Sequence, residues 1–376
     1  MKLIKNILVA LDFRDSTETI VSNAMMFAKK FKSKVTLIHI LPENIENEKV
    51  GDLVKKAAHE ELEKINERFK KENIEMGEPI LKFGNYSDRI VFASKETGAS
   101  LIILGAGEKK NKDSYQLGTT AGKVMRRSSK PVFVIKNNQD LTEIKNILCP
   151  VDFSDESSHA LNNAIAIARL FDSKLVVLSV YIPFVQTITR IDPVEVNSQR
   201  EVDQELDLKR FLEKHNMQSI NYVQEIAGGE PDEEILKAIE RHNIDLLSMG
   251  TTGRSGFNKI LLGSVAEKVT REVLCSFITS KKEDFIEFEI KSENVKDTYA
   301  YAQELFEKGF YTEAIELYKA SLELNFSHVP SLMGLTKSYE KLGDEENAGK
   351  YRKMVKNVIE QFQNFKIEEE VRKSMR

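Results

Sequence analysis

Cysteine is scarce in this sequence, tryptophan is absent, and no long apolar run occurs. The two cysteines, Cys149 and Cys275, each stand inside a short apolar segment, which excludes a disulfide framework and is typical of the reducing cytoplasm. No stretch approaches the roughly 18 apolar residues that a membrane span requires. The apolar run near the N-terminus is too short for a signal peptide. We therefore expect a cytoplasmic protein with no membrane partner.

An excess of charge of one sign is lacking too. The 55 Lys and Arg residues against 59 Asp and Glu residues give a formal net charge of −4, so we expect no nucleic-acid partner. The six histidines lack metal-ligand spacing, and we expect surface or packing roles for them and no protein metal site. What the chain does have is length, because 376 residues predict two or three domains.

The first three quarters of the chain repeat themselves. The segment IKNILVALDF (4–13) returns as IKNILCPVDF (144–153), and LGTTAGKVMR later returns as LGSVAEKVTR. A repeat of this length predicts two homologous domains in tandem rather than a solenoid. We place the first copy at residues 1–138 and the second copy at residues 142–281.

Within each copy, short β-branched runs alternate with segments of helical spacing. Ile7–Leu11 and Val35–Ile40 are typical of strands buried on both faces, and Ser16–Phe31 between them predicts a helix opened by a Ser or Thr cap. The alternation continues to Val132–Ile135 and predicts a doubly wound, Rossmann-like parallel sheet of about five strands in each copy. Ligands of such sheets bind beyond the carboxyl ends of the strands, where the strand order reverses.

A glycine pattern follows the fourth strand of the second copy. Gly250, Gly253 and Gly263 are spaced by two and nine residues, and Ser264 comes directly after the last of them. Glycine lets a ligand approach the bare backbone, and the start of a helix at this point suits an anion. Ser264 would either cap that helix or donate to a phosphate oxygen. The alternative is a mobile glycine loop before an ordinary N-cap.

The pattern resembles the nucleotide-binding form of the universal stress protein family, whose signature is G-x2-G-x9-G-S/T with an aspartate closing the first strand. The second copy has that aspartate at Asp152 and a Gly229-Glu230-Pro231 turn like the family's G-x-P, whereas Ala266 replaces a hydroxyl that some binders carry. The resemblance implies ATP or another adenine nucleotide, with Mg²⁺ brought by its phosphates. It assigns to the nucleotide Pro150, Val151, Asp152, Val180, Met249, Gly250, Thr252, Gly253, Gly263, Ser264 and Val265.

The first copy matches the signature incompletely. It keeps Asp12, Gly105, Gly118 and Thr119, but Glu108 stands at the second glycine position, and Tyr86 replaces the proline of the turn. A carboxylate there would face phosphate oxygens, so we expect a degenerate site unless Gly107 shifts the loop and restores it. The resemblance also implies that the last strands of the two copies, Val132–Ile135 and Ser276–Thr279, pair as in a dimer.

The remaining chain, residues 292–376, is expected to be entirely helical. Ala302, Leu305, Gly309 and Ala314 follow the small and large rhythm of a tetratricopeptide repeat, and a weaker second repeat follows 34 residues later. Two such repeats are fewer than an independent stack needs. Either a last helix at Val355–Arg372 caps them, or they dock on the tandem domains or on another chain. They would bind a protein partner or a second copy of the chain, as in a homodimer.

Three functions are compatible with these features. The first is a stress-response protein that binds an adenine nucleotide in the second copy and makes protein contacts through the helical tail. The second is an enzyme, a slow ATPase or a self-phosphorylating protein, for which the glycine pattern supplies no defensible catalytic base, with Arg254 as its nearest cation. The third is a scaffold that binds no nucleotide and acts through its tail. We expect the first.

Overall fold

The computed structural model describes residues 4–42, 48–107, 109–111, 114–115, 117–136, 143–185, 192–251, 262–280, 295–325 and 327–374. The chain divides into two units. One spans Lys2–Glu287, and the other spans Phe288–Arg376 together with Met1. Among the described helices none is both long and apolar enough to cross a membrane.

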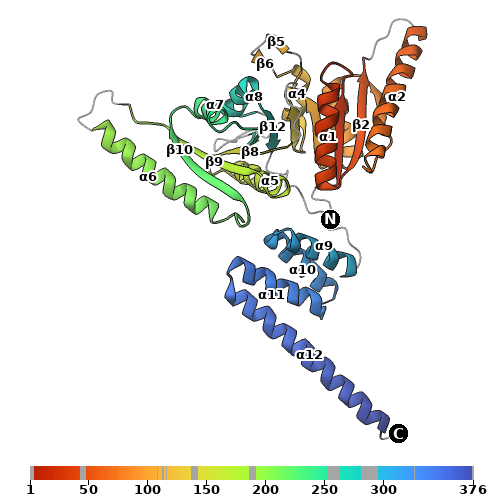
Figure 1. Ribbon diagram of the computed structural model, residues 1–376, viewed down its shortest axis with the longest axis vertical. Coiled ribbons are helices and arrows are strands. Elements are labelled where there is room, and N and C mark those ends of the chain that lie inside the picture. The colour runs from red at the N-terminus through yellow and green to blue at the C-terminus, as the bar shows by residue number, and fades with distance from the viewer. Residues whose placement is uncertain are drawn as a thin grey trace. The chain divides into compact units, whose positions relative to one another are not determined.

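A single ten-stranded sheet runs through the first unit (Figure 1), in the order β10-β9-β8-β11-β12-β7-β4-β1-β2-β3. Five strands come from each copy. Those of the first copy are β1 (Asn6–Leu11), β2 (Lys34–Leu41), β3 (Ile80–Phe83), β4 (Leu101–Gly105) and β7 (Val132–Ile135). Those of the second copy are β8 (Asn146–Val151), β9 (Lys174–Tyr181), β10 (Asn221–Gly228), β11 (Leu246–Gly250) and β12 (Ser276–Ser280).

The two copies meet where β7 and β12 pair antiparallel, with Ile278 opposite Phe133, while every other neighbouring pair of the large sheet is parallel. The predicted pairing of the last strands is thereby confirmed. Two sheets that would each leave an apolar edge strand open are thus joined into one. A separate short ribbon, β5 (Lys109–Asn111) with β6 (Ser114–Tyr115), lies between β4 and α4 in the chain.

Within the described residues, eight helices connect the strands of the large sheet. In the first copy they are α1 (Thr17–Phe31), α2 (Glu48–Lys71), α3 (Tyr86–Glu96) and α4 (Thr119–Arg127). In the second copy they are α5 (Asp155–Phe171), α6 (Pro193–Leu212), α7 (Pro231–Arg241) and α8 (Ser264–Glu272). Ser16 occupies the N-cap position of α1, as predicted, but its side chain makes no capping hydrogen bond. In α5 the oxygen of Ser154 does cap, accepting from the backbone N–H of Ser157 at 3.2 Å.

Aromatic side chains fill the seam between the copies. The ring of Phe27 in α1 lies 4.6 Å from that of Phe133 in β7 and 5.4 Å from that of Phe171 in α5. Rings at these separations pack favourably beyond the area they bury. The backbone N–H of Lys136 crosses the seam as well, donating to Ser276 Oγ at 3.1 Å. The core is therefore continuous from one copy to the other.

The described residues of the second unit form four helices: α9 (Val295–Glu307), α10 (Tyr311–Leu324), α11 (Val329–Leu342) and α12 (Glu345–Ser374). Neighbouring helices along the chain pack on one another. Gly309 and Gly343 adopt φ of 81° and 75° just after α9 and α11, where a left-handed residue ends a helix at little cost. The predicted separate last helix from Val355 is wrong. The helix that begins at Glu345 continues through that position without a break.

Candidate functional site

The strand order of the second copy reverses between β8 and β11. From β8 the chain crosses to β9 on one side, and from β11 it crosses to β12 on the other side. A cavity of about 340 Å³ opens at the carboxyl ends of these strands. The described residues that line it are Pro150, Val151, Asp152, Ser157, Leu178, Val180, Pro231, Ile235, Met249, Gly250, Thr251, Gly263, Ser264, Val265 and Ala266.

The lining contains every residue that the sequence assigned to a nucleotide except Thr252 and Gly253. Those two, like Arg254, lie outside the described residues. The assigned residues come from β8, β9, β11 and the start of α8, segments that lie far apart along the chain. The structure therefore brings them together at one opening.

A tight turn fixes the direction of Asp152 after β8. Phe153 adopts φ of 65°, a left-handed conformation that is costly for a bulky residue, and its ring packs 5.4 Å from that of Phe211. The carboxylate of Asp152 accepts from both the backbone N–H and the hydroxyl of Ser154, at 3.1 and 2.5 Å. The first copy repeats the strained turn, with φ of 56° at Phe13.

The start of α8 forms the polar wall of the cavity. Gly263 occupies the N-cap position, and Ser264 is the first helical residue and is exposed. The alternative in which Ser264 caps the helix is therefore wrong. The first intrahelical bond runs from Glu267 N–H to Gly263 O at 2.8 Å. The N–H groups of Ser264, Val265 and Ala266 consequently have no partner within the helix. Three such groups at the positive end of a helix dipole favour an anion.

Backbone hydrogen bonds hold this wall in place. Gly263 N–H donates to Thr251 O at 2.7 Å, and Thr251 N–H donates to Ser280 O at 3.1 Å, which ties the start of α8 to the ends of β11 and β12. Gly250 has a structural reason of its own, because a Cβ there would lie 3.2 Å from the backbone carbon of Glu156 in α5. Close passage of α5 thus favours a glycine at this position.

The other walls of the cavity are apolar. Leu178 and Val180 of β9, Ile235 of α7 and Met249 of β11 give this side no ionisable group. The sequence did not indicate Leu178 or Ile235, because their spacing is that of ordinary core residues and only the fold turns them toward the opening. A flat apolar group would fit between these side chains, next to an anion at α8.

The first copy has a cavity at the equivalent place, with a volume of about 420 Å³. All four residues that the sequence singled out in this copy, Asp12, Gly105, Gly118 and Thr119, line it, whereas Glu108 lies outside the described residues. Gly118 caps α4 with φ −61° and ψ 149°, nearly the values of Gly263 in the second copy, −60° and 150°. The helix start that favours an anion is therefore present in both copies.

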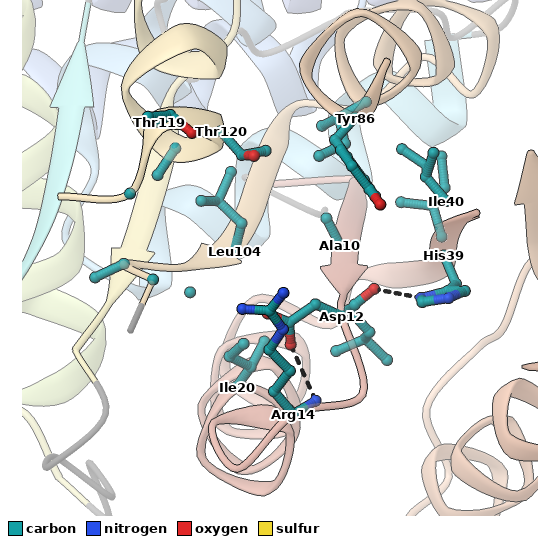
Figure 2. A pocket seen from close by; sticks show the side chains of 18 of the residues that line it. Ala10, Asp12, Arg14, Ile20, His39, Ile40, Tyr86, Leu104, Thr119 and Thr120 are labelled. Carbon is teal, nitrogen blue, oxygen red and sulfur yellow. Dashed lines mark hydrogen bonds and ion pairs between the residues drawn. The ribbon is translucent and has the colours of Figure 1, made fainter. Parts of the chain in front are cut away.

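Two side chains give the first cavity a different chemistry. Figure 2 shows Arg14 beside Asp12. The Nε of Arg14 lies 3.9 Å from Oδ2 of Asp12, and the second copy has a serine, Ser154, at the position equivalent to Arg14. His39 also lines this cavity; its Nδ1 lies 2.8 Å from Leu11 O and its ring stacks 4.2 Å from Phe13. Burial lowers the pKa of His39, so the ring is neutral at pH 7 and Nδ1 donates. The sequence gave no sign that His39 lines a cavity.

A serine, a histidine and an asparagine lie in line elsewhere in the second copy. Ser158 Oγ is 3.2 Å from His215 Nε2, and His215 Nδ1 is 2.8 Å from Asn162 Oδ1. The set resembles a hydrolytic triad, but Ser158 stands inside α5 with its N–H bonded to Ser154 O at 3.0 Å, and neither cavity described above includes it. Burial lowers the pKa of His215 to about 4, which makes it a poor base at neutral pH. We assign these residues to the packing of α5 against the end of α6.

Metal-ligating side chains do not gather anywhere in the described part of the chain: no group of three or more His, Cys, Asp or Glu residues there could hold a metal ion. Cys149 and Cys275 are buried free thiols, and burial raises the pKa of Cys275 to about 12. The chemistry of the two cavities therefore rests on aspartate, hydroxyl and backbone groups, joined in the first copy by Arg14 and His39.

Comparison with known proteins finds one family and several relatives. The family model described as universal stress protein family matches residues 3–136 and again 143–281. A universal stress protein of Methanocaldococcus jannaschii is 34% identical over 155 residues, which cover 40% of this chain and 88% of the relative. A solved universal stress protein from Archaeoglobus fulgidus is 19% identical with a TM-score of 0.56, covering 74% of this chain and 98% of its own. A solved universal stress protein in complex with cAMP is 21% identical with a TM-score of 0.29, covering 36% of this chain and 98% of its own.

Proposed function

The chain belongs to the universal stress protein family, and from that premise we propose that its second copy binds ATP or a related adenine nucleotide. The observation that carries the proposal is the cavity of the second copy, where an apolar slot, a fixed carboxylate and the N–H groups of α8 that lack a partner within the helix share one opening. A base, a ribose and a phosphate chain require these three surfaces in this order. The cavity volume, about 340 Å³, lies within the range of small-molecule sites.

Each part of the nucleotide has a place in this proposal. The base lies against Val180 and Met249, and Pro150 and Val151 flank Asp152. The ribose hydroxyls donate to Asp152. The phosphates lie at Gly250 and at the start of α8, where Gly263, Ser264 and Val265 hold them. The family resemblance assigns Thr252 and Gly253, which lie outside the described residues, to the phosphates as well. Mg²⁺ arrives with the phosphates and is held mainly by them.

We propose binding without rapid turnover as the role of this site. Its assigned residues position a ligand, and the one carboxylate among them is assigned to the ribose. A slow ATPase or a self-phosphorylating protein is the alternative, and it would be recognised by ADP or a phosphoprotein that accumulates during incubation with ATP and Mg²⁺.

The first copy is proposed as a weaker second site of the same kind. Its cavity of about 420 Å³ and its α4 start favour occupancy, while Glu108 at the second glycine position opposes it. We further propose that α9–α12 form two tetratricopeptide-like repeats that contact a protein partner or a second copy of the chain. Buried Tyr318, which packs against Gly334, is the large-against-small contact that such repeats use.

Calorimetric titration with ATP and Mg²⁺ tests the proposal, using Ser264→Glu and the matched Thr119→Glu. Both residues are exposed first residues of a helix, where a carboxylate suits the dipole and leaves the fold intact, yet it repels phosphate. We expect Ser264→Glu to weaken the tighter binding at least tenfold, and Thr119→Glu to leave that binding unchanged. ATP binding that Ser264→Glu does not alter would contradict the assignment, and no binding to the wild type would leave the scaffold reading.

A further inference from the structure

A second cavity of about 390 Å³ adjoins the candidate nucleotide site. The two cavities share Asp152 and Val180, and the new one is walled by the end of β9 and by side chains of α6. Successive side chains of a strand point to opposite faces, and Val180 lines the slot with Ile235 of α7, whereas Ser179 bonds to α6. The cavity of about 390 Å³ therefore opens on the α6 side of β9, and the apolar slot opens on the α7 side.

The three polar side chains that α6 contributes to this cavity are bonded differently. Arg200 donates to Ile182 O at 2.6 Å and its guanidinium lies 5.8 Å from the ring centre of Phe184, which fixes the chain after β9. Asp203 accepts from Gln199 at 2.8 Å, within the helix itself. Gln204 alone hydrogen-bonds the strand that carries Val180. Gln204 is therefore the α6 side chain that reaches the backbone of Val180, a residue that lines both cavities.

The hydrogen bonds of Gln204 fix the orientation of its carboxamide. Its Nε2 donates to Ser179 Oγ at 2.7 Å and to Val180 O at 3.4 Å, and Ser179 Oγ in turn donates to Val151 O at 3.3 Å. Because a carbonyl oxygen only accepts, the amino group must face the strand. Oε1 is then left as an acceptor, and it bonds no residue in the described part of the chain.

The first copy fills the equivalent place in another way. There His39 bonds the last carbonyl of its first strand, Leu11 O, at 2.8 Å, as Ser179 bonds Val151 O in the second copy. The second copy thus has the small Ser179 where the first copy has the imidazole of His39. The space that this leaves at the end of β9 is occupied by the carboxamide of Gln204 from α6. This exchange places a neutral acceptor next to the residue assigned to the base.

We propose that Gln204 determines which base the second copy accepts. This inference rests on the proposed function and adds a residue to it. With the base against Val180, Oε1 of Gln204 accepts a hydrogen bond from the exocyclic amino group at position 6 of adenine. Hypoxanthine has an oxygen at that position and would bring two acceptors together, leaving both unpaired. Gln204 is only half-buried, so the discrimination is about tenfold rather than the far larger factor of a fully enclosed site.

Competition between ATP and inosine triphosphate tests this role, because the two differ at position 6 and the adjacent ring nitrogen only. We expect the wild type to bind ATP about tenfold more tightly, and Gln204→Leu to lose that preference mainly by losing ATP affinity. Gln218→Leu, at an exposed glutamine after α6 that lines neither cavity, is the matched control and should keep the wild-type ratio.

The outcomes separate the two claims. A wild type that binds neither nucleotide contradicts the proposed function itself. A wild type that binds ATP, with a ratio that Gln204→Leu leaves unchanged, overturns the role of Gln204 alone. Equal loss of ATP and inosine triphosphate in Gln204→Leu also overturns it, because that result would show a packing role and no reading of the base.

Discussion

Replacing Gly250 or Gly105 by alanine adds a Cβ that meets the backbone of a helix in one case and the tip of a side chain in the other. The two glycines end β11 and β4, one in each copy. A Cβ at Gly250 would lie 3.2 Å from the backbone carbon and from Cβ of Glu156, at the start of α5. A Cβ at Gly105 would lie closer to its neighbour, 2.9 Å from Cδ1 of Ile20. Distance alone would therefore make Gly105→Ala the more harmful change.

The kind of neighbouring atom predicts the reverse. Backbone atoms of α5 cannot move without shifting the helix, and overpacking of this kind costs about 1–3 kcal/mol. The tip of Ile20 lines the 420 Å³ cavity and can rotate into it. Both alanines also restrict the unfolded chain, which stabilises by roughly 0.4–1 kcal/mol. We expect Gly250→Ala to lower the free energy of unfolding by about 1 kcal/mol and Gly105→Ala to leave it nearly unchanged.

Urea denaturation of the two variants, without added nucleotide, measures the difference. The midpoint for Gly250→Ala should fall clearly below the wild type, and that for Gly105→Ala should stay close to it. If Gly105→Ala cost as much as Gly250→Ala or more, the argument from flexible and rigid neighbours would be refuted, and with it the view that close passage of α5 favours Gly250.

Three further predictions concern other parts of the chain. Burial lowers the pKa of His215 from 6.5 to about 4, so the stability that the neutral ring gives is fully present above pH 6.5 and is lost as the pH falls toward 4. Between these pH values, the wild type should lose about 1–2 kcal/mol of unfolding free energy that His215→Gln does not lose, as measured by melting at different pH. Gly334→Ala would place a Cβ 2.3 Å from the buried ring of Tyr318. The amides of α11 should then exchange faster, by an amount that corresponds to a fall of about 3 kcal/mol in the free energy of opening. Burial raises the pKa of Cys149 and of Cys275, so a thiol reagent should label them only in denaturant.

The regular elements of the large sheet could be predicted because their signals are local. Strand β7 covers Val132–Ile135 as its apolar run predicted, and strands β1 and β2 contain the predicted Ile7–Leu11 and Val35–Ile40. The helix ends were harder, because capping depends on one backbone conformation. Ser16 stands at the N-cap position of α1, but its side chain makes no capping bond. In α8 the N-cap residue is Gly263 and not Ser264. The tail helix α12 runs past Val355 because nothing in its sequence ends it there.

The candidate site was predictable where it depends on glycine spacing and unpredictable where it depends on distant packing. Gly250, Gly263 and Asp152 were indicated by their positions after strands. His39 was not, because a single histidine in an apolar strand has no pattern to distinguish it from a core residue. Gln204 carries even less signal, since only the packing of α6 on β9 brings its carboxamide to Val180.

The central claim is that the second copy binds an adenine nucleotide, and the most direct test is mass spectrometry of small molecules released by acid from the purified wild type and Ser264→Glu. The claim predicts an adenine nucleotide from the wild type, near one per chain if only the site of the second copy is filled, and a clear loss of that nucleotide in Ser264→Glu. An equal amount from both proteins, or a wild type that releases no nucleotide and binds no added ATP, would contradict it.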